Sequence, residues 1–231
     1  MSRLVHVLRA GKTDYQSALL LQKTVSSTIL NNPGGPLRNV LILTEHDPVY
    51  TVGIRTKDYG ESEEQRLRAL GAQFFRTNRG GLITFHGPGQ LVAYPVLNLR
   101  NFQPSVRWYV CHIEKTIIEL CRRYGVRAGT TEDTGVWVQD RKICAIGIHA
   151  SRYVTTHGLA LNCRNDLSWF EHIVPCGIAG KGVTSLSNET GRPLGLDAVT
   201  PEFLDSFRVT LECDLQELHD DQREVLLGKA A

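Results

Sequence analysis

The chain has 231 residues, of which 42% are hydrophobic and 22% charged, and its formal net charge is +2. This composition is typical of a folded globular domain and excludes a disordered chain. The small net charge argues against nucleic acid or a membrane surface as the main partner. No apolar run approaches the roughly 18 residues needed to span a bilayer. We expect one domain over residues 1–214, followed by a polar, mobile tail at 215–231.

The N-terminal third is expected to contain both strands and helices. Apolar segments predict strands at residues 4–8, 40–44 and 49–54. The first helix is predicted to begin at Thr13, where Gln16 completes a capping box, and to end at the NNPGG sequence. A second Ser-x-x-Gln start predicts a short helix at residues 62–70.

The rest of the chain is expected to be rich in strands. Strands are predicted at residues 73–77, 82–85, 91–99, 136–138, 142–148 and 154–162. The last three must be antiparallel, because their links are too short for the crossover that parallel strands need. Helices are predicted at 104–124 and from Thr200, where Pro201 takes the first helical position. This irregular order predicts an α+β fold: a single domain with a mostly antiparallel or mixed sheet flanked by helices.

Six cysteines stand at positions 111, 121, 144, 163, 176 and 213. No two form a C-x-x-C pair, which is unlike a disulfide framework, so we expect a reducing compartment and mostly buried thiols. The first thirteen residues contain Arg3, Arg9 and Lys12 and no acid. This pattern is weakly typical of a mitochondrial presequence, but a strand explains the same residues equally well.

Cys176 differs from the other cysteines because it stands in the Pro- and Gly-rich sequence IVPCGIAGKG. Gly177 lets a substrate come close, and a loop leaves the thiol accessible, so Cys176 is a candidate nucleophile. The alternative is a packed loop thiol, and the residues alone do not decide between the two. A free thiol is only a few per cent ionised near neutral pH, so a nucleophile would need a neighbouring cation.

Lys142 is a candidate for that cation. It begins a predicted strand whose same face carries Cys144, Ile146 and Ile148. A lysine at the start of an apolar face either extends to solvent at the sheet edge or reaches into a site. Both interpretations stay open at this point.

Two further motifs combine glycine with histidine, RGGLITFHGPGQ from Arg79 and THGLALN from Thr156. Gly80-Gly81 permits close backbone approach, and exposed amides can hold a carbonyl or a phosphate. The alternative is a glycine-turn hairpin that binds nothing.

Several common motifs are excluded. The GKGVT sequence at Gly180 fails the P-loop pattern, and no G-x-G-x-x-G follows a strand and opens a helix. The eight histidines show no metal-ligand spacing, and a G-x-S-x-G nucleophile motif is absent. A Cys–His hydrolase remains conceivable with His86, His157 or His172 as the base, because nothing in the spacing selects one of them.

Four blocks together resemble the lipoyl(octanoyl) transferases of lipoate biosynthesis. They are RGGLITFHGPGQL from Arg79, GVWVQDRKICAIG from Gly135, THGLALN from Thr156 and PCGIAGKGVTSL from Pro175. The resemblance extends over about residues 4–211 and implies the catalytic fold of biotin and lipoate protein ligases. The WFEH sequence at 169–172 resembles the animal members, which implies a mitochondrial location, whereas a bacterial member would be cytoplasmic.

The resemblance also implies an activity. The family moves an octanoyl group from octanoyl-acyl carrier protein to a lysine of a lipoyl domain. The acceptors are 2-oxoacid dehydrogenase complexes and the glycine cleavage H protein. The resemblance implies an acyl-thioester on Cys176, with Lys142 lowering the pKa of that thiol, and no cofactor or metal. Substrate contacts are implied for Arg79, Gly80, Gly81, Leu82, Ile83, Thr84, Phe85, His86, Ala145, Ile146, Gly147, Gly158, Leu159 and Ala160.

Within this set, Leu82, Ile83, Phe85, Ile146 and Leu159 are expected to line a closed tunnel for the acyl chain. Two alternatives stay open. One is an ATP-dependent lipoate or biotin ligase of the same fold, which needs an adenylating site and no nucleophilic cysteine. The other is a non-catalytic scaffold that binds carrier proteins, in which Cys176 is structural.

Overall fold

The computed structural model describes residues 3–55, 59–174 and 180–219, together with 221, 222, 224 and 226. The helices are α1 (Tyr15–Asn31), α2 (Glu61–Ala69), η1 (Leu99–Asn101), α3 (Val106–Arg123), η2 (Ser168–His172), α4 (Leu186–Thr190) and α5 (Leu196–Leu211). The strands are β1 (Leu4–Lys12), β2 (Asn39–Glu45), β3 (Val49–Val52), β4 (Gln73–Arg76), β5 (Thr84–His86), β6 (Gln90–Leu97), β7 (Val136–Val138), β8 (Arg141–Ser151), β9 (Val154–Asn162), β10 (Gly182–Val183) and β11 (Asp214–Glu217).

Among the described residues, eight strands form one large mixed sheet in the order β10-β8-β9-β6-β2-β1-β11, with β7 also paired to β8. The central strands β2, β6, β9 and β8 are antiparallel, whereas β1 runs parallel to both β2 and β11. The antiparallel order of β7, β8 and β9 confirms the prediction from their short links. The α+β mixed sheet expected from the sequence is therefore confirmed.

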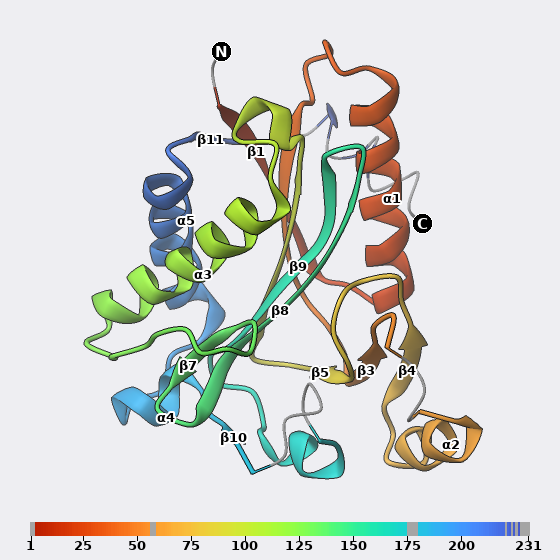
Figure 1. Ribbon diagram of the computed structural model, residues 1–231, viewed down its shortest axis with the longest axis vertical. Helices are drawn as coiled ribbons and strands as arrows, with labels where there is room; N and C mark the ends of the chain where they lie inside the picture. The colour runs from red at the N-terminus through yellow and green to blue at the C-terminus, as the bar shows by residue number, and fades with distance from the viewer. Residues whose placement is uncertain are drawn as a thin grey trace.

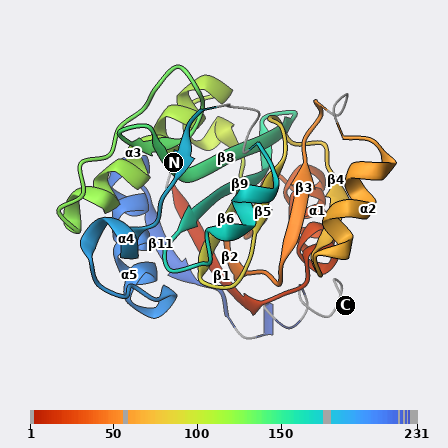
Figure 2. The same ribbon diagram turned by 90° about the horizontal axis from the view of Figure 1, so that it is seen from below.

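Helices cover both faces of the large sheet. Helices α3 and α5 pack on one face and α1 on the other, which Figures 1 and 2 show from two directions. Helix α3 forms because Ser105 caps its first turn and because Tyr109, Ile113 and Ile117 recur on its inner side at helical spacing. Burying each of these side chains contributes about 1.5–3 kcal/mol. The two helical layers fix the sheet as the rigid support of the site.

A second, three-stranded sheet, β4-β3-β5, lies beside the large sheet and carries α2 (Figure 1). Its core contains Tyr50, Phe74, Ile83 and Phe85. Helix η2 closes this cluster, because Trp169 stacks on Phe85 with ring centroids 5.1 Å apart and planes 6° apart. Strand β5 therefore has one side in this cluster and the other side toward the large sheet.

The structure differs from the sequence predictions at several boundaries, and three of these differences have a clear local cause. Helix α1 is capped by Asp14, whose carboxylate accepts from the Ser17 amide, and not by Thr13. Helix α5 begins at Leu196 after Gly195, so Pro201 lies inside the helix. Residues 214–217 form β11 on the edge of the sheet, where an unpaired edge of β1 offers backbone hydrogen bonds.

The expected tail is thus partly packed, since Leu218 and Leu226 are buried in the core on the α1 side. None of the helices in the described ranges is long and apolar enough to cross a bilayer.

Candidate active site

The Arg79–Leu82 loop lies directly on strand β8. The Gly80 amide donates to the Ile148 carbonyl at 2.9 Å. A Cβ atom on Gly147 would lie 2.9 Å from the Gly80 carbonyl oxygen, which is closer than real Cβ contacts allow. Glycine is therefore required at position 147 for the loop to seat, and the close backbone approach expected for Gly80-Gly81 is made within the protein itself.

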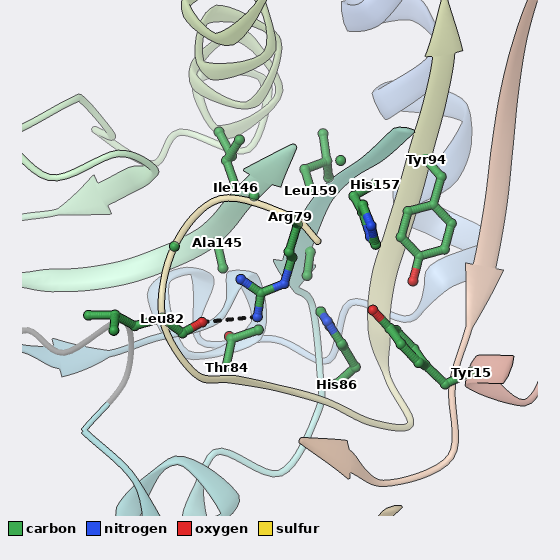
Figure 3. Close-up of a pocket in the computed structure, with 14 residues that line it drawn as sticks. Tyr15, Arg79, Leu82, Thr84, His86, Tyr94, Ala145, Ile146, His157 and Leu159 are labelled. Atoms are coloured by element: carbon green, nitrogen blue, oxygen red, sulfur yellow. Dashed lines mark hydrogen bonds between the residues drawn. The ribbon is translucent and has the colours of Figure 1, made fainter. Parts of the chain in front are cut away.

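The side chain of Arg79 holds this loop in place through hydrogen bonds. Its guanidinium is buried, and Nη2 donates to the Thr51 carbonyl at 2.7 Å, the Thr51 hydroxyl at 2.9 Å and the Leu82 carbonyl at 3.0 Å. The bond to Leu82 is drawn in Figure 3. Because Thr51 belongs to β3, these bonds tie the loop to the small sheet. Arg79 thus holds the glycine loop between the two sheets.

A pocket, called here the inner pocket, lies between this loop and the β8–β9 hairpin (Figure 3). It is lined by Tyr15, Arg79, Gly81, Leu82, Thr84, His86, Tyr94, Ala145, Ile146, Gly147, His157, Gly158, Leu159 and Ala160. The three segments singled out in the sequence thus meet around one space. The segments from β8 and β9 meet because of the hairpin register, in which Ala145 pairs with Ala160 and Gly147 with Gly158.

Three of the expected substrate-contact residues are absent from this lining. Gly80 lies at the adjoining cleft described below. Ile83 and Phe85 are buried in the cluster of the small sheet instead. Side chains alternate along the chain here, so Thr84 and His86 face the inner pocket, whereas Ile83 and Phe85 face away from it. The sequence predicted an apolar wall here but did not show which side of the strand faced the pocket.

One side of the inner pocket is polar and rigid. Tyr15 stacks on His86 with ring centroids 6.0 Å apart. His86 donates from Nδ1 to Gln90 Oε1 at 2.9 Å. The Tyr94 hydroxyl donates to His46 Nε2 at 2.8 Å, because His46 Nδ1 already donates to the Thr13 carbonyl. Burial lowers the pKa of His86 to about 3, so these groups are neutral near pH 7.

A second cleft, called here the outer cleft, adjoins the inner pocket. It shares Gly81, Leu82, Ile146 and Gly147 with the inner pocket. Its other lining residues are Arg55, Gly80, Val106, Val110, Asp133, Thr134, Lys142 and Ile148. The two spaces are therefore neighbours along β8, and Lys142 stands in the outer one.

Lys142 is buried, with only 5% of its surface exposed. Its ammonium donates to the Thr134 carbonyl at 3.2 Å and lies 4.6 Å from the centre of the Trp137 ring. Lys181 lies over the same ring at 4.8 Å and contacts Asp133 at 3.3 Å. Lys142 therefore reaches into a site and does not extend to solvent at the sheet edge.

Strand β10 connects Lys142 to the segment that contains Cys176. Val183 pairs with Lys142, and the Thr184 amide donates to the Lys142 carbonyl at 3.0 Å. Cys176 itself lies outside the described residues, seven positions before Val183 in the chain. The described chain that follows the candidate nucleophile in sequence, at Gly182 and Val183, is thus paired with the strand of the candidate lysine.

Sequence comparison identifies the family. The model of the lipoyl protein ligase A/B catalytic domain matches residues 14–208. The chain belongs to this family. It is 56% identical over 211 residues to the mitochondrial octanoyl-[acyl-carrier-protein]:protein N-octanoyltransferase of Danio rerio, covering 91% of this chain and 94% of that protein. It is 46% identical over 220 residues to the Homo sapiens protein of the same name, covering 91% and 95%.

These relatives place the chain among the octanoyltransferases of the family, so the expected enzyme class and the expected likeness to mitochondrial animal members are confirmed. A solved structure, lipoate-protein ligase A bound with ATP, superposes with a TM-score of 0.73 at 16% identity, covering 99% of this chain and 94% of that one. This likeness shows the fold alone, and it confirms the expected ligase-type catalytic fold.

Four of the five described cysteines are buried and hold their protons strongly. Burial raises the pKa of Cys121, Cys163 and Cys213 to about 12 and that of Cys144 well above the ordinary value. Cys111 is exposed on α3. The expectation of mostly buried thiols therefore holds for the described cysteines.

Two of the three candidate histidines are poor candidates for a base. Burial lowers the pKa of His86 and His157 to about 3, far from the neutral range in which a general base works best. His172 lies in η2, where its carbonyl accepts from Arg66. No group of three or more metal-ligating side chains occurs within the described ranges.

Sequence reasoning missed three residues of the site: Trp137, Tyr15 and Tyr94. Trp137 was visible only as part of the GVWV sequence, and it lies beside Lys142 because the two residues pair across β7 and β8. Tyr15 and Tyr94 come from α1 and β6, and no local pattern marks a tyrosine that faces a pocket.

Proposed function

We propose that the protein transfers an octanoyl group from octanoyl-acyl carrier protein to a lysine of a lipoyl domain, through a thioester on Cys176. The arrangement of the two adjoining cavities supports this proposal most strongly. The inner pocket suits an acyl chain, and Lys142 lies beside it in the outer cleft. The pairing of Val183 with Lys142 supports a reacting pair of Lys142 and Cys176.

Leu82, Ile146 and Leu159 give the inner pocket an apolar lining that suits an acyl chain, and its open volume of about 40 Å³ means that its walls must separate for eight carbons to enter. Each methylene that leaves water contributes about 0.8 kcal/mol, so eight carbons gain several kcal/mol. The glycines at 147 and 158 let the glycine loop and strand β6 pack closely on the hairpin, which brings the walls of the pocket together. Arg79, Thr84 and His86 complete the wall.

The proposed reaction has two acyl transfers. The Cys176 thiolate attacks the carbonyl carbon of the donor thioester, and the carrier thiolate leaves and takes a proton from Lys142. The acceptor lysine amine then attacks the Cys176 thioester. The Cys176 sulfur leaves as a thiolate, and the amine proton passes to Lys142. The cationic Lys142 favours the thiolate form of Cys176 and so lowers its pKa.

The names of the relatives support the choice of donor and of a protein as the acceptor. The names of the zebrafish and human proteins specify an octanoyl-acyl carrier protein and a protein acceptor. We assign the same donor to this chain. The proposed acceptors are the lipoyl domains of 2-oxoacid dehydrogenase complexes and the glycine cleavage H protein. No nucleotide or other cofactor is needed, because the donor is already a thioester.

Incubation of the protein with octanoyl-acyl carrier protein and a lipoyl domain, without ATP, tests the proposal. We expect octanoyl amide on the acceptor lysine, read by mass spectrometry, and loss of transfer in Cys176→Ser. The matched control, Cys111→Ser, removes an exposed thiol on α3 and should transfer normally. Transfer that requires ATP, or that persists in Cys176→Ser, would contradict the proposal and favour a ligase mechanism.

A further inference from the structure

A third cavity, called here the α1 groove, lies between helix α1 and the β8–β9 hairpin. Its volume is about 370 Å³, within the usual range of small-ligand sites. Leu19, Gln22, Ser26 and Leu30 line its helix side, because residues three or four apart share one face of a helix. The groove is separate from the outer cleft that contains Lys142.

His157 forms the partition between the α1 groove and the inner pocket. Among the described residues, it alone lines both cavities. In Figure 3 its ring is drawn on the Tyr94 side of the pocket, away from Leu82, which borders the outer cleft. An acyl chain that enters past Leu82 therefore points toward His157.

The conformation of His157 is costly for the protein. Its φ of 58° lies in the left-handed region, which non-glycine residues seldom adopt. Its side chain is buried, and Nδ1 has no hydrogen-bond partner within the described part of the chain. Strain and an unpaired buried atom at one residue indicate a constraint other than stability.

Two hydrogen bonds hold the ring in this place. His157 Nε2 donates to Asn78 Oδ1 at 2.8 Å, and its backbone amide donates to Gln22 Oε1 at 2.6 Å. Asn78 precedes the glycine loop and Gln22 belongs to α1, so two separate segments that line the α1 groove anchor His157. The ring is therefore a fixed partition rather than a loosely packed surface group.

We propose that His157 sets the acyl-chain length of the enzyme by closing the inner pocket against the α1 groove. With His157 in place, a chain longer than the pocket must overpack the partition. Without it, the chain extends into the groove and contacts Leu19 and Leu30. This inference rests on the proposed function, since it takes the inner pocket as the acyl site.

His157→Gly is the informative variant, because glycine removes the partition and also adopts the left-handed backbone without strain. The experiment mixes octanoyl-, decanoyl- and dodecanoyl-acyl carrier protein with a lipoyl domain and reads the chain length on the acceptor lysine. Overpacking by 1–3 kcal/mol corresponds to roughly a 5- to 150-fold preference for the shorter chain. We expect the ratio of dodecanoyl to octanoyl product to rise about tenfold or more in His157→Gly.

A second substitution tests the route. Ser26→Trp fills the α1 groove from the helix side and should leave the wild-type product ratio unchanged. Combined with His157→Gly, it should return the ratio toward the wild-type value. His157→Asn tolerates the same backbone conformation and should give an intermediate ratio, which keeps the test informative if the glycine variant is unstable.

The outcomes separate the two proposals. A wild-type protein that transfers no octanoyl group would overturn the proposed function itself. If the wild type transfers octanoyl and neither His157 variant changes the product ratio, His157 does not set chain length. If the ratio rises equally with and without Ser26→Trp, the chain does not enter the α1 groove, and that part of the inference fails.

Discussion

The ammonium of Lys142 lies 4.6 Å from the centre of the Trp137 ring, so the buried cation rests against an aromatic surface. Lys142 and Trp137 face each other across the β7–β8 pairing. A cation–π contact of this kind contributes about 0.5–2 kcal/mol when it is shielded from water. Trp137 therefore positions the charge that the proposed mechanism requires.

Trp137→Phe and Trp137→Leu test this contact. Phenylalanine keeps an aromatic face, whereas leucine removes it. We expect Trp137→Phe to acylate Cys176 within about threefold of the wild-type rate and Trp137→Leu to be slower by about tenfold, which corresponds to 1.4 kcal/mol. Single-turnover acylation gives the rates, and thermal unfolding checks that both variants fold. Equal rates in the two variants would show that the ring does not support Lys142.

The role of Lys142 can be measured through the reactivity of Cys176. Lys142→Ala should raise the pH at which iodoacetamide modifies Cys176, because the thiolate is the reactive form. Cys111→Ser serves as the background, since the remaining described cysteines are buried. An alkylation profile that does not move would remove Lys142 from this role.

Lys142→Arg separates charge from proton transfer. Arginine keeps the positive charge but does not give up its proton. If the charge alone matters, alkylation and delivery to the acceptor lysine should both persist. If Lys142 also accepts a proton, delivery should fall while alkylation stays near normal.

The buried histidines make stability dependent on pH. The pKa of His86 and His157 is about 3 in the folded protein and about 6.5 in an unfolded chain, so below pH 6.5 the unfolded state binds more protons. As the pH falls from about 6.5 to 3, each histidine therefore lowers the free energy of unfolding by roughly 1.4 kcal/mol for every pH unit. Urea unfolding at pH 7 and pH 5.5 measures this loss.

His157→Asn is the matched variant for that measurement. It removes one of the two titrating groups while tolerating the left-handed backbone. We expect a smaller drop in stability between the two pH values than in the wild type. An equal drop would mean that folding does not lower the pKa of His157.

A substitution at Phe85 tests whether its side chain lies in the core of the small sheet and outside the acyl pocket. Phe85→Leu removes the stack on Trp169 and should lower stability by about 0.5–1.5 kcal/mol, while the acyl-chain preference stays at the wild-type value. Product chain lengths and chemical unfolding check the two parts. A changed chain preference would return Phe85 to the acyl site, as the sequence suggested.

Much of this architecture could be predicted from the sequence, because the signals are local. Helix α3 follows from its apolar period and its Gly125 stop, and the antiparallel hairpin of β8 and β9 follows from a two-residue turn. Strand β11 could not be predicted, since its residues Asp214–Glu217 are mostly polar and its pairing partner β1 lies at the other end of the chain.

Some residues of the candidate site could likewise be predicted from local motifs, and others could not. Its glycines and Arg79 stand in conspicuous motifs, so the sequence found them. The side of β5 that faces the pocket, and the placing of Tyr15 against His86, depend on how separate elements pack. Such contacts have no signature in the local sequence.

Intact mass spectrometry detects the proposed thioester on Cys176. The wild-type protein is incubated with octanoyl-acyl carrier protein alone, without ATP or an acceptor, and is then digested to locate the modification. We expect a mass gain of one octanoyl group, located on Cys176, removed by hydroxylamine and lost in Cys176→Ser. An unmodified Cys176 in a preparation that still octanoylates a lipoyl domain would contradict this expectation.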